Sequence, residues 1–240
     1  MSLMCSKFKI VTLAVFVVSS LSACDVDTFI QANSVSVIEI KDYKQARKVF
    51  WQSVYPAKAK TLYCDKEFDS RQRKGINVEH VFPMSWATNG VDCGTRNQCR
   101  TSSSKFNLIE ADMHNLYPSR SDVNQQRGSF RFGEVSGEKR KFGKQCDFEV
   151  NYHARVVEPR PEIRGEVARS MFYMADRYKS DGLVLFEKQA RLLYKWHKAD
   201  PPTDQELKRY GLIERLQRNR NRFIDEPELL DQLINNGHFF

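Results

Sequence analysis

The chain has 240 residues, of which 41% are hydrophobic and 28% charged, and its formal net charge is +8 at pH 7. This length suits one domain behind a short leader and is sufficient to bury a substantial core. No internal repeat or low-complexity tract is visible, which excludes a repeat architecture, and the basic excess fits contact with nucleic acid or anionic membrane as well as a simple solvated surface.

Residues 1–23 have the features of a secretory signal. Lys7 and Lys9 precede an apolar run over residues 10–18, which is shorter than the roughly 20 residues that a membrane-spanning helix needs, and small residues follow it. Because the leader carries two lysines and no acid, the mature chain keeps a net charge of +6.

The leader ends in Leu21-Ser22-Ala23-Cys24, a pattern typical of bacterial lipoproteins, in which Cys24 becomes the lipidated first residue. Ordinary cleavage with an incidental cysteine is the alternative. We therefore expect an exported protein that is periplasmic, anchored to a membrane through Cys24, or secreted. An extended tether over residues 24–41 then precedes one folded domain over residues 42–240.

The folded domain contains four cysteines, an even number that agrees with an oxidising compartment. Of the three pairings that four cysteines allow, we expect Cys93–Cys99, which closes a polar loop, and Cys64–Cys146, which joins distant segments. A zinc site is the rival interpretation, although the spacings contain no C-x-x-C motif.

The first part of the domain combines short strands with a helix. Asp42 is a suitable N-cap for a helix over residues 43–54, where apolar residues recur at helical spacing until Pro56 stops it. Apolar runs predict short strands, and charged or polar composition predicts loops. The expected strands cover residues 35–40 and 61–64, and the expected loops cover residues 65–75 and 88–104.

A strand over residues 76–83 contains the pair Glu79-His80. Adjacent side chains of a strand point to opposite faces, so both can act at one centre only if the backbone bends or the strand ends there, and Pro83 favours a bend. Together they could hold a divalent metal beside a base that activates water. The alternative is a surface Glu79 followed by a core His80.

The loop predicted over residues 88–104 carries Arg96 and Arg100 beside the cysteines that we expect to pair. A guanidinium group binds phosphate in a bidentate fork, so a disulfide-braced loop of this kind is a candidate phosphate contact. Solvated loop arginines are the alternative.

Residues 106–113 have the pattern of a short helix and residues 114–118 that of a returning strand. Asp122 can then cap a helix that begins near Val123, with Gln125 placed as in a capping box and Asn124 near the helix start. The predicted order is strand, loop, strand, helix. The C-terminal half is predicted to be helical over residues 162–178, 186–197 and 203–220. A basic run follows, which either extends the surface that contacts nucleic acid or is only solvated (Arg215, Arg218, Arg220 and Arg222).

These blocks, in this order, resemble bacterial endonuclease I, a family of exported, sequence-nonspecific nucleases of the ββα-metal (His-Me finger) superfamily. The resemblance covers roughly residues 43–225 and implies an α+β fold, a mainly helical single domain built around the ββα-metal motif. The blocks that carry it are Glu79-His80-Val81-x-Pro83, Phe106-Asn107, Glu110-Ala111-Asp112-x-His114-Asn115-Leu116-x-Pro118, Val123-Asn124, residues 145–151, residues 159–169, and Asn221-Arg222-Phe223.

The resemblance also implies roles for individual residues. The general base of the family matches His80, its metal-binding carboxylate matches Glu79, and its metal-binding helix amide matches Asn124. The arginine that contacts the cleaved phosphate matches Arg96. Weaker candidates that would support the site from behind are Glu110, Asp112 and Asn115.

Elementary chemistry agrees with these roles. The pKa of histidine lies near neutrality, and Mg²⁺ prefers oxygen ligands and keeps several waters, so one carboxylate and one amide suffice. We expect an Mg²⁺-dependent monomeric endonuclease that leaves 5′-phosphates on DNA and also cleaves RNA, with Mn²⁺ or Ca²⁺ as structural substitutes. The alternatives are a noncatalytic nucleic-acid-binding lipoprotein and an RNA-preferring nuclease.

Overall fold

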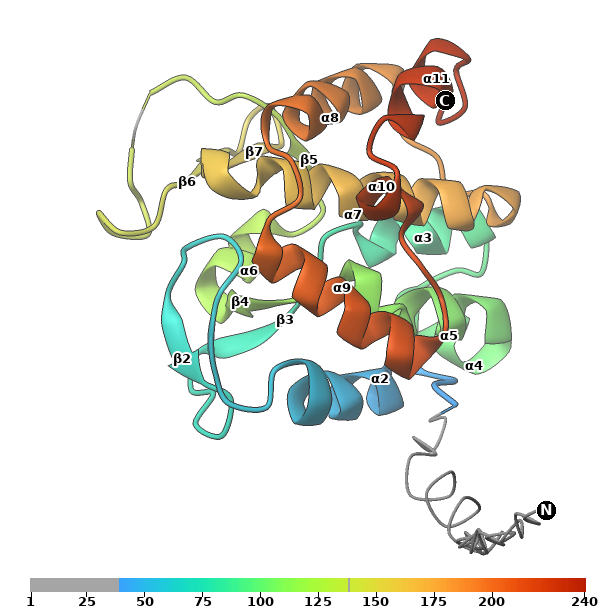
Figure 1. The fold of residues 1–240 in the computed structure, drawn as a ribbon, viewed down its shortest axis with the longest axis horizontal. Coiled ribbons are helices and arrows are strands. Elements are labelled where there is room, and N and C mark those ends of the chain that lie inside the picture. The colour runs from blue at the N-terminus through green and yellow to red at the C-terminus, as the bar shows by residue number, and fades with distance from the viewer. Residues whose placement is uncertain (1–38, 138) are drawn as a thin grey trace, which may run out of the picture. The chain divides into compact units, whose positions relative to one another are not determined.

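The computed structural model describes residues 39–137 and 139–240 (Figure 1). The expected signal peptide, Cys24, residues 24–38 of the expected tether and residues 35–38 of the expected strand lie outside these ranges. Within the described residues no helix is long and apolar enough to cross a membrane. The expected α+β architecture, a mainly helical single domain, is confirmed.

Helices dominate the chain, and the strands form three small sheets. The helical elements are α2 (Tyr43–Val49), η1 (Phe50–Val54, a π-helix), α3 (Met84–Val91), α4 (Arg96–Ser102), α5 (Ser104–Ala111), η2 (Met113–Asn115), α6 (Ser121–Arg127), η3 (Pro161–Ile163), α7 (Arg164–Arg177), η4 (Lys179–Asp181), α8 (Glu187–Ala199), α9 (Asp204–Gln217), α10 (Arg222–Asp225) and α11 (Leu229–Asn235). The strands are β1 (Lys58–Lys60), β2 (Glu67–Asp69), β3 (Ile76–His80), β4 (Leu116–Arg120), β5 (Arg131–Phe132), β6 (Phe148–Asn151) and β7 (Val156–Pro159).

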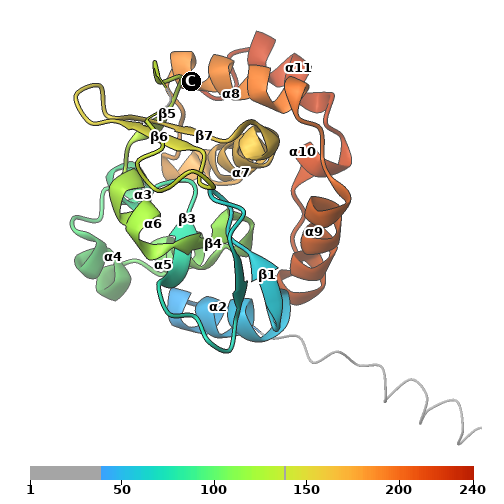
Figure 2. The same cartoon turned by 90° about the vertical axis from the view of Figure 1, so that its left-hand side faces the viewer.

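The antiparallel pair β3–β4, followed directly by α6, confirms the two strands and the helix of the predicted order, but α3, α4, α5 and η2 lie between the strands where that order had a loop. Figure 2 shows α2 beneath the strand pair and α6 along its side. Apolar residues of α2 and η1 pack against Ile76 and Val78 of β3. Ala46, Val49 and Phe50 recur at helical spacing because they form the side of the helix that is buried in this contact. Asp42 caps α2 as predicted, through a hydrogen bond from Gln45 N to Asp42 Oδ1 of 2.9 Å.

The larger core surrounds α7, whose residues 167–175 are all buried. Its first turn lies against the end of α8, where Gly165 N donates to Asp200 Oδ2 at 2.8 Å. A Cβ atom at Gly165 would lie 1.8 Å from the Asp200 carbonyl oxygen, so only glycine fits this crossing. The three C-terminal helices expected over residues 162–220 are present as α7, α8 and α9.

Several local predictions were wrong. Residues 61–64 form a turn after β1 instead of a strand, and the charged loop over residues 65–75 contains β2. The polar stretch over residues 88–104 is largely helical, since it includes the end of α3, all of α4 and the start of α5. Asp122 was expected to cap α6, but Arg120 occupies the N-cap position, and its side chain forms no capping hydrogen bond. Asp122 instead pairs with the Arg120 guanidinium at 2.6 Å.

Candidate active site

The strand β3 presents its side chains to two different environments. Its ladder with β4 is regular from Ile76 opposite Arg120 to His80 opposite Leu116. Glu79 and His80 therefore point to opposite faces, as neighbours in a strand do. The bend that we predicted between them is absent, and that prediction was wrong, but the strand ends at His80, which is the other possibility that the sequence left open.

Glu79 lies on the face that meets α6 and the turn after β1. Its side chain is 3% exposed. Tyr63 Oη donates to Glu79 Oε1 at 2.7 Å, and Arg127 Nε lies 3.3 Å from the same oxygen. Burial raises the pKa of Glu79, whereas the Arg127 charge and the Tyr63 hydrogen bond oppose that shift.

The edge of β3 that faces away from β4 is open to other partners. The carbonyl of Pro118 in β4 accepts a hydrogen bond from Leu62 N at 2.8 Å and so points away from β3. Val78, its partner in the ladder, is consequently in a pair that exchanges no hydrogen bonds. By the alternation of antiparallel ladders, the carbonyls of Val78 and His80 point to the free edge of β3.

The helix α6 covers this free edge. Asn124 Nδ2 donates to the Val78 carbonyl at 3.2 Å and to Asn77 Oδ1 at 2.9 Å. One turn later, Arg127 Nη1 donates to the His80 carbonyl at 3.3 Å. Asn124 is therefore fixed through its nitrogen, and its amide oxygen is the atom that could bind a metal ion.

The donor set on this side fits a hard cation. Glu79 offers carboxylate oxygen and Asn124 offers amide oxygen, the ligand types that Mg²⁺ prefers when most of its shell is water or substrate. Among the described residues there is no cluster of three His, Cys, Asp or Glu side chains that could hold a metal ion, as a zinc site would require.

His80 lies on the opposite face, between α2 and α5, and is 8% exposed. Its Nε2 is 3.0 Å from the Glu110 carbonyl oxygen. A carbonyl only accepts hydrogen bonds, so Nε2 carries the proton and Nδ1 of the neutral ring keeps its lone pair. Burial, and then the nearby Arg96 charge, lower the pKa of His80 to about 3, so the ring is neutral at pH 7.

Arg96 and Arg100 lie near His80 and share one buried carboxylate. Glu110 is 1% exposed; its Oε1 accepts from Arg96 Nε at 2.5 Å and from Arg100 Nη2 at 2.7 Å, and its Oε2 accepts from Arg100 Nε at 2.8 Å. Burial alone would raise the pKa of Glu110, but the bonds and charges of Arg100 and Arg96 hold it below its usual value.

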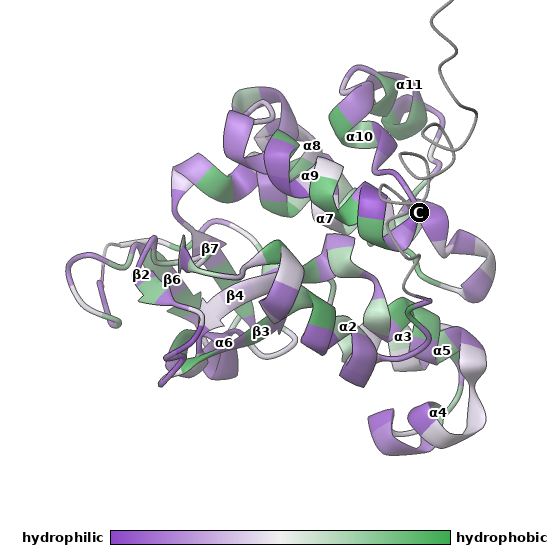
Figure 3. Ribbon diagram, turned by 60° about the horizontal axis from the view of Figure 1, so that its bottom comes forward, coloured by the Kyte–Doolittle hydropathy of each residue, from purple (hydrophilic) through white to green (hydrophobic). Residues whose placement is uncertain are grey.

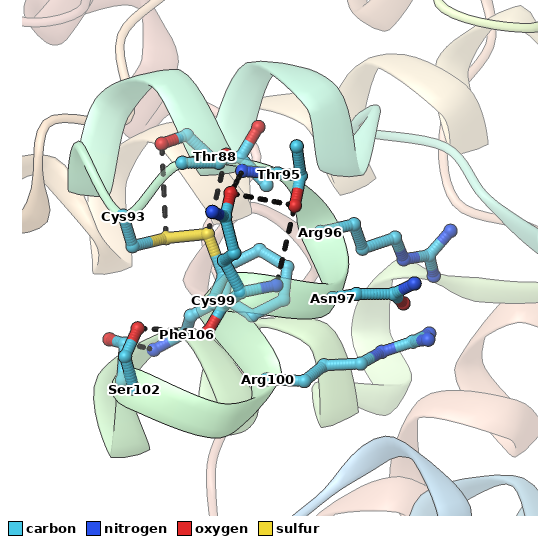
Figure 4. The surroundings of a disulfide bond; sticks show 12 residues. Thr88, Cys93, Thr95, Arg96, Asn97, Cys99, Arg100, Ser102 and Phe106 are labelled. Carbon is cyan, nitrogen blue, oxygen red and sulfur yellow. Dashed lines mark hydrogen bonds between the residues drawn. A yellow bond between two sulfur atoms is a disulfide. The ribbon is translucent and has the colours of Figure 1, made fainter.

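The arginines are carried by α4, which the second disulfide anchors. Both predicted disulfides are present, Cys64–Cys146 and Cys93–Cys99. Figure 4 shows Arg96 and Arg100 extending side by side from α4, away from the disulfide. The helix begins with a capping box of Thr95 and Gln98, and Figure 3 shows it as hydrophilic along most of its length.

The three residues expected to support the site have different surroundings. Glu110 holds the two arginines, as described above. The Asn115 side chain forms two hydrogen bonds with the backbone of Phe82, two residues after His80. Phe82 N donates to Asn115 Oδ1 at 2.6 Å, and Asn115 Nδ2 donates to Phe82 O at 3.0 Å. Asp112 instead accepts hydrogen bonds from Tyr173, Tyr178 and Gln217, and thus joins α5 to the C-terminal half rather than to the site.

One residue beside the site was not a candidate from the sequence. Tyr43 places its ring 4.9 Å from the His80 ring and 5.8 Å from the Cζ atoms of both Arg96 and Arg100. Its sequence signal was only that of an apolar position in the first turn of a helix, so no local pattern could have assigned it to the site.

Two members of the C-terminal arginine cluster are engaged by carboxylates. Arg220 pairs with Glu214 and Asp225, and Arg222 pairs with Asp176. These pairs reduce the positive charge that the cluster could offer to a polyanion.

Known nucleases share sequence with this chain. The chain is similar to an extracellular deoxyribonuclease of Aeromonas hydrophila, 36% identical over 155 residues, which cover 63% of this chain and 65% of that relative. It is 29% identical over 210 residues to Endonuclease-1 of Buchnera aphidicola (subsp. Acyrthosiphon pisum), with 83% and 81% of the two chains covered.

A third relative is an extracellular ribonuclease of Bacillus subtilis, 34% identical over 192 residues, or 72% of this chain and 60% of the relative. The family model for endonuclease I matches residues 11–228, which is most of the sequence. The chain belongs to the endonuclease I family.

Proposed function

We propose that the protein is an exported, Mg²⁺-dependent endonuclease that hydrolyses phosphodiester bonds without sequence specificity. The observation that supports this most directly is the environment of His80, a neutral imidazole whose Nε2 is held by a backbone carbonyl and which lies next to two arginines. Binding alone requires no oriented base, so this geometry favours catalysis over a noncatalytic binding protein.

His80 acts as the general base. Its Nδ1 takes a proton from a water molecule, the oxygen of that water attacks phosphorus, and the bond from phosphorus to the 3′ oxygen breaks. The 3′ oxygen leaves as an oxyanion and takes a proton from a second water molecule, and His80 later releases its proton to solvent, so the products are a 5′-phosphate and a 3′-hydroxyl. Substrate phosphate brought next to His80 offsets the Arg96 charge, which raises the pKa of the imidazole and makes it a stronger base during turnover.

Glu79 and Asn124 would hold the metal ion through their oxygen atoms. When bound, Mg²⁺ would neutralise the negative charge that develops on the phosphate and on the leaving oxygen. The position of α6 along the free edge of β3 supports this assignment, because Asn124 donates to the carbonyl of Val78, the neighbour of Glu79 in the strand.

Arg96, with Arg100 beside it, binds the phosphate that is cleaved. Both side chains are partly exposed, 42% and 38%, although Glu110 accepts from Nε of each arginine and from Nη2 of Arg100. Glu110 therefore sets the direction of the two side chains and leaves their remaining N–H groups for phosphate oxygens.

The relatives include nucleases named for DNA and for RNA, and we propose that this chain cleaves both. Their names also describe extracellular and periplasmic proteins, which together with two disulfides supports export. Lipidation of Cys24 stays a prediction.

The test uses purified protein with supercoiled plasmid and with RNA, each with Mg²⁺ or with EDTA. Cleavage of both substrates that EDTA abolishes is the expected result. Binding without cleavage would identify a noncatalytic protein, cleavage of RNA alone would identify a ribonuclease, and full activity in EDTA would contradict the role of the metal.

A further inference from the structure

A basic groove begins at the candidate active site and follows α2 away from it. It has a volume of about 1190 Å³, and Arg100 and Glu110 lie at the end next to His80. Tyr43, which contacts the His80 ring, also lines it, while Trp51 and Arg73 line its far end. This volume exceeds the roughly 300–1,000 Å³ of a pocket for one small molecule.

The wall formed by α2 supplies positive charge at helical spacing. Lys44 and Lys48 are four residues apart, and Arg47 lies between them on the adjacent row. All three side chains are exposed, line the groove and form no ion pair with any residue in the described ranges. This contrasts with Arg71 in the opposite wall, which is paired with Asp69 at 2.6 Å.

The far end of the groove is more rigid. The guanidinium carbon of Arg73 lies 4.6 Å from the centroid of the Trp51 ring, and Arg73 also donates to the Ser70 carbonyl. Arg73 is thus held on an aromatic face without a carboxylate partner among residues 39–137 and 139–240, and it remains a cation at the wall.

The length of this wall corresponds to several nucleotides. From Tyr43 to Trp51 the helix advances eight residues, or about 12 Å at 1.5 Å per residue. At the roughly 3.4 Å spacing of a strand in B-form DNA, this corresponds to about three or four nucleotides.

We propose that the α2 groove binds one nucleic-acid strand, the three or four nucleotides on one side of the cleaved bond, through phosphate contacts to Lys44, Arg47 and Lys48. This inference rests on the proposed nuclease function and adds to it the path of the substrate beyond the catalytic residues. Contacts to phosphates carry no sequence information, so the groove suits a nuclease that is not sequence-specific.

The experiment removes three positive charges from α2 in the full mature chain, with Lys44→Gln, Arg47→Gln and Lys48→Gln combined. The matched control removes three exposed charges from α8, with Lys188→Gln, Arg191→Gln and Lys195→Gln. Binding of a fluorescent 20-nucleotide strand and of the matching duplex is measured in EDTA by anisotropy over a range of salt concentrations. Thermal unfolding confirms that both variants are folded.

For the α2 variant we expect the dissociation constant to rise on the order of tenfold or more, and the salt slope to fall by about two for the single strand or nearly three for the duplex, as removal of three phosphate contacts predicts. The α8 control should bind like the wild type. The form of DNA that loses more affinity, single strand or duplex, is the form whose strand binds in the groove. An unchanged salt slope, or an equal loss in the α8 control, would overturn the inference.

Because binding is measured without metal, this result does not depend on cleavage. A wild-type protein that binds through α2 but cleaves nothing would overturn the proposed function and leave the groove in place. A wild-type protein that cleaves plasmid while the α2 variant binds normally would overturn only the groove.

Discussion

Replacement of Glu110 by glutamine tests the arginine pair that lies near His80. The carboxylate is 1% exposed and accepts three charge-assisted hydrogen bonds, of 2.5, 2.7 and 2.8 Å. Breaking a fully buried pair costs about 3–5 kcal/mol, but both arginines are more than a third exposed, so water can replace part of the lost interaction. We therefore expect Glu110→Gln to lower the free energy of unfolding by about 2 kcal/mol.

For a chain of this size that change lowers Tm by about 4–8 °C. The arginine partners hold the pKa of Glu110 below its usual value, so this stabilisation is present above the unfolded pKa and is lost as pH falls through the folded one. The difference between wild type and variant should therefore shrink in acid. Phosphodiester cleavage should fall at least tenfold, since Arg96 and Arg100 lose their fixed direction.

Urea unfolding and plasmid nicking measure both effects, with Glu187→Gln as the matched control. Glu187 pairs with Arg191 at 2.6 Å, but both side chains are more than half exposed, so its loss should cost less than about 1 kcal/mol. If Glu110→Gln is as stable as Glu187→Gln and nicks plasmid at the wild-type rate, the reasoning is wrong.

Three further predictions concern residues that hold the fold together. Asp112→Ala should destabilise the protein by about 3 kcal/mol, because the hydroxyls of buried Tyr173 and half-buried Tyr178 lose their acceptor. KM of the folded enzyme should stay unchanged, and a raised KM would place Asp112 in the site. Loss of Cys64–Cys146, whose cysteines are 82 residues apart, should cost more stability than loss of Cys93–Cys99, whose cysteines are 6 apart. Loss of Cys93–Cys99 should reduce cleavage more, because this disulfide anchors α4. The reverse order in either assay would contradict the prediction. Burial lowers the pKa of His114 to about 4, so the unfolded chain binds more protons than the folded one between pH 6.5 and 4. Stability therefore decreases as the pH is lowered through this range, by up to about 1.4 kcal/mol per unit. His114→Gln should flatten that slope in urea titrations, and an unchanged slope would refute the assignment.

The parts of the fold with local signals could be predicted from the sequence. The helix after Asp42 and the long C-terminal helices followed from helical spacing and capping, and the strand, strand, helix order followed from the motif. The helical nature of α4 also had a signal, because Thr95 and Gln98 form a capping box, but the polar composition of that stretch favoured a loop.

Other features depend on contacts between distant segments. The parallel pairing of the two-residue strand β5 with β7 has no local signature. Glu110 and Asp112 are only two residues apart, yet one binds the arginines of α4 and the other the tyrosines of α7, because the chain leaves the helical path after Ala111. The sequence could identify both as candidates but could not separate their roles.

The positions of Glu79 and His80 show the same limit. The motif predicted that both serve one centre, and a bend was the simplest way to achieve it. The regular ladder instead keeps them on opposite faces, and α6 lies along the free edge between them. Only the tertiary placement of α6 relates the oxygen ligands to the imidazole.

The most direct test of the proposed mechanism is the rate of plasmid nicking by His80→Ala in Mg²⁺ buffer, relative to the wild type. Loss of a general base costs about 10²–10⁴-fold, and we expect a decrease in that range while the variant still binds DNA in EDTA. Nicking by His80→Ala at the wild-type rate would contradict the assignment of His80 as the base.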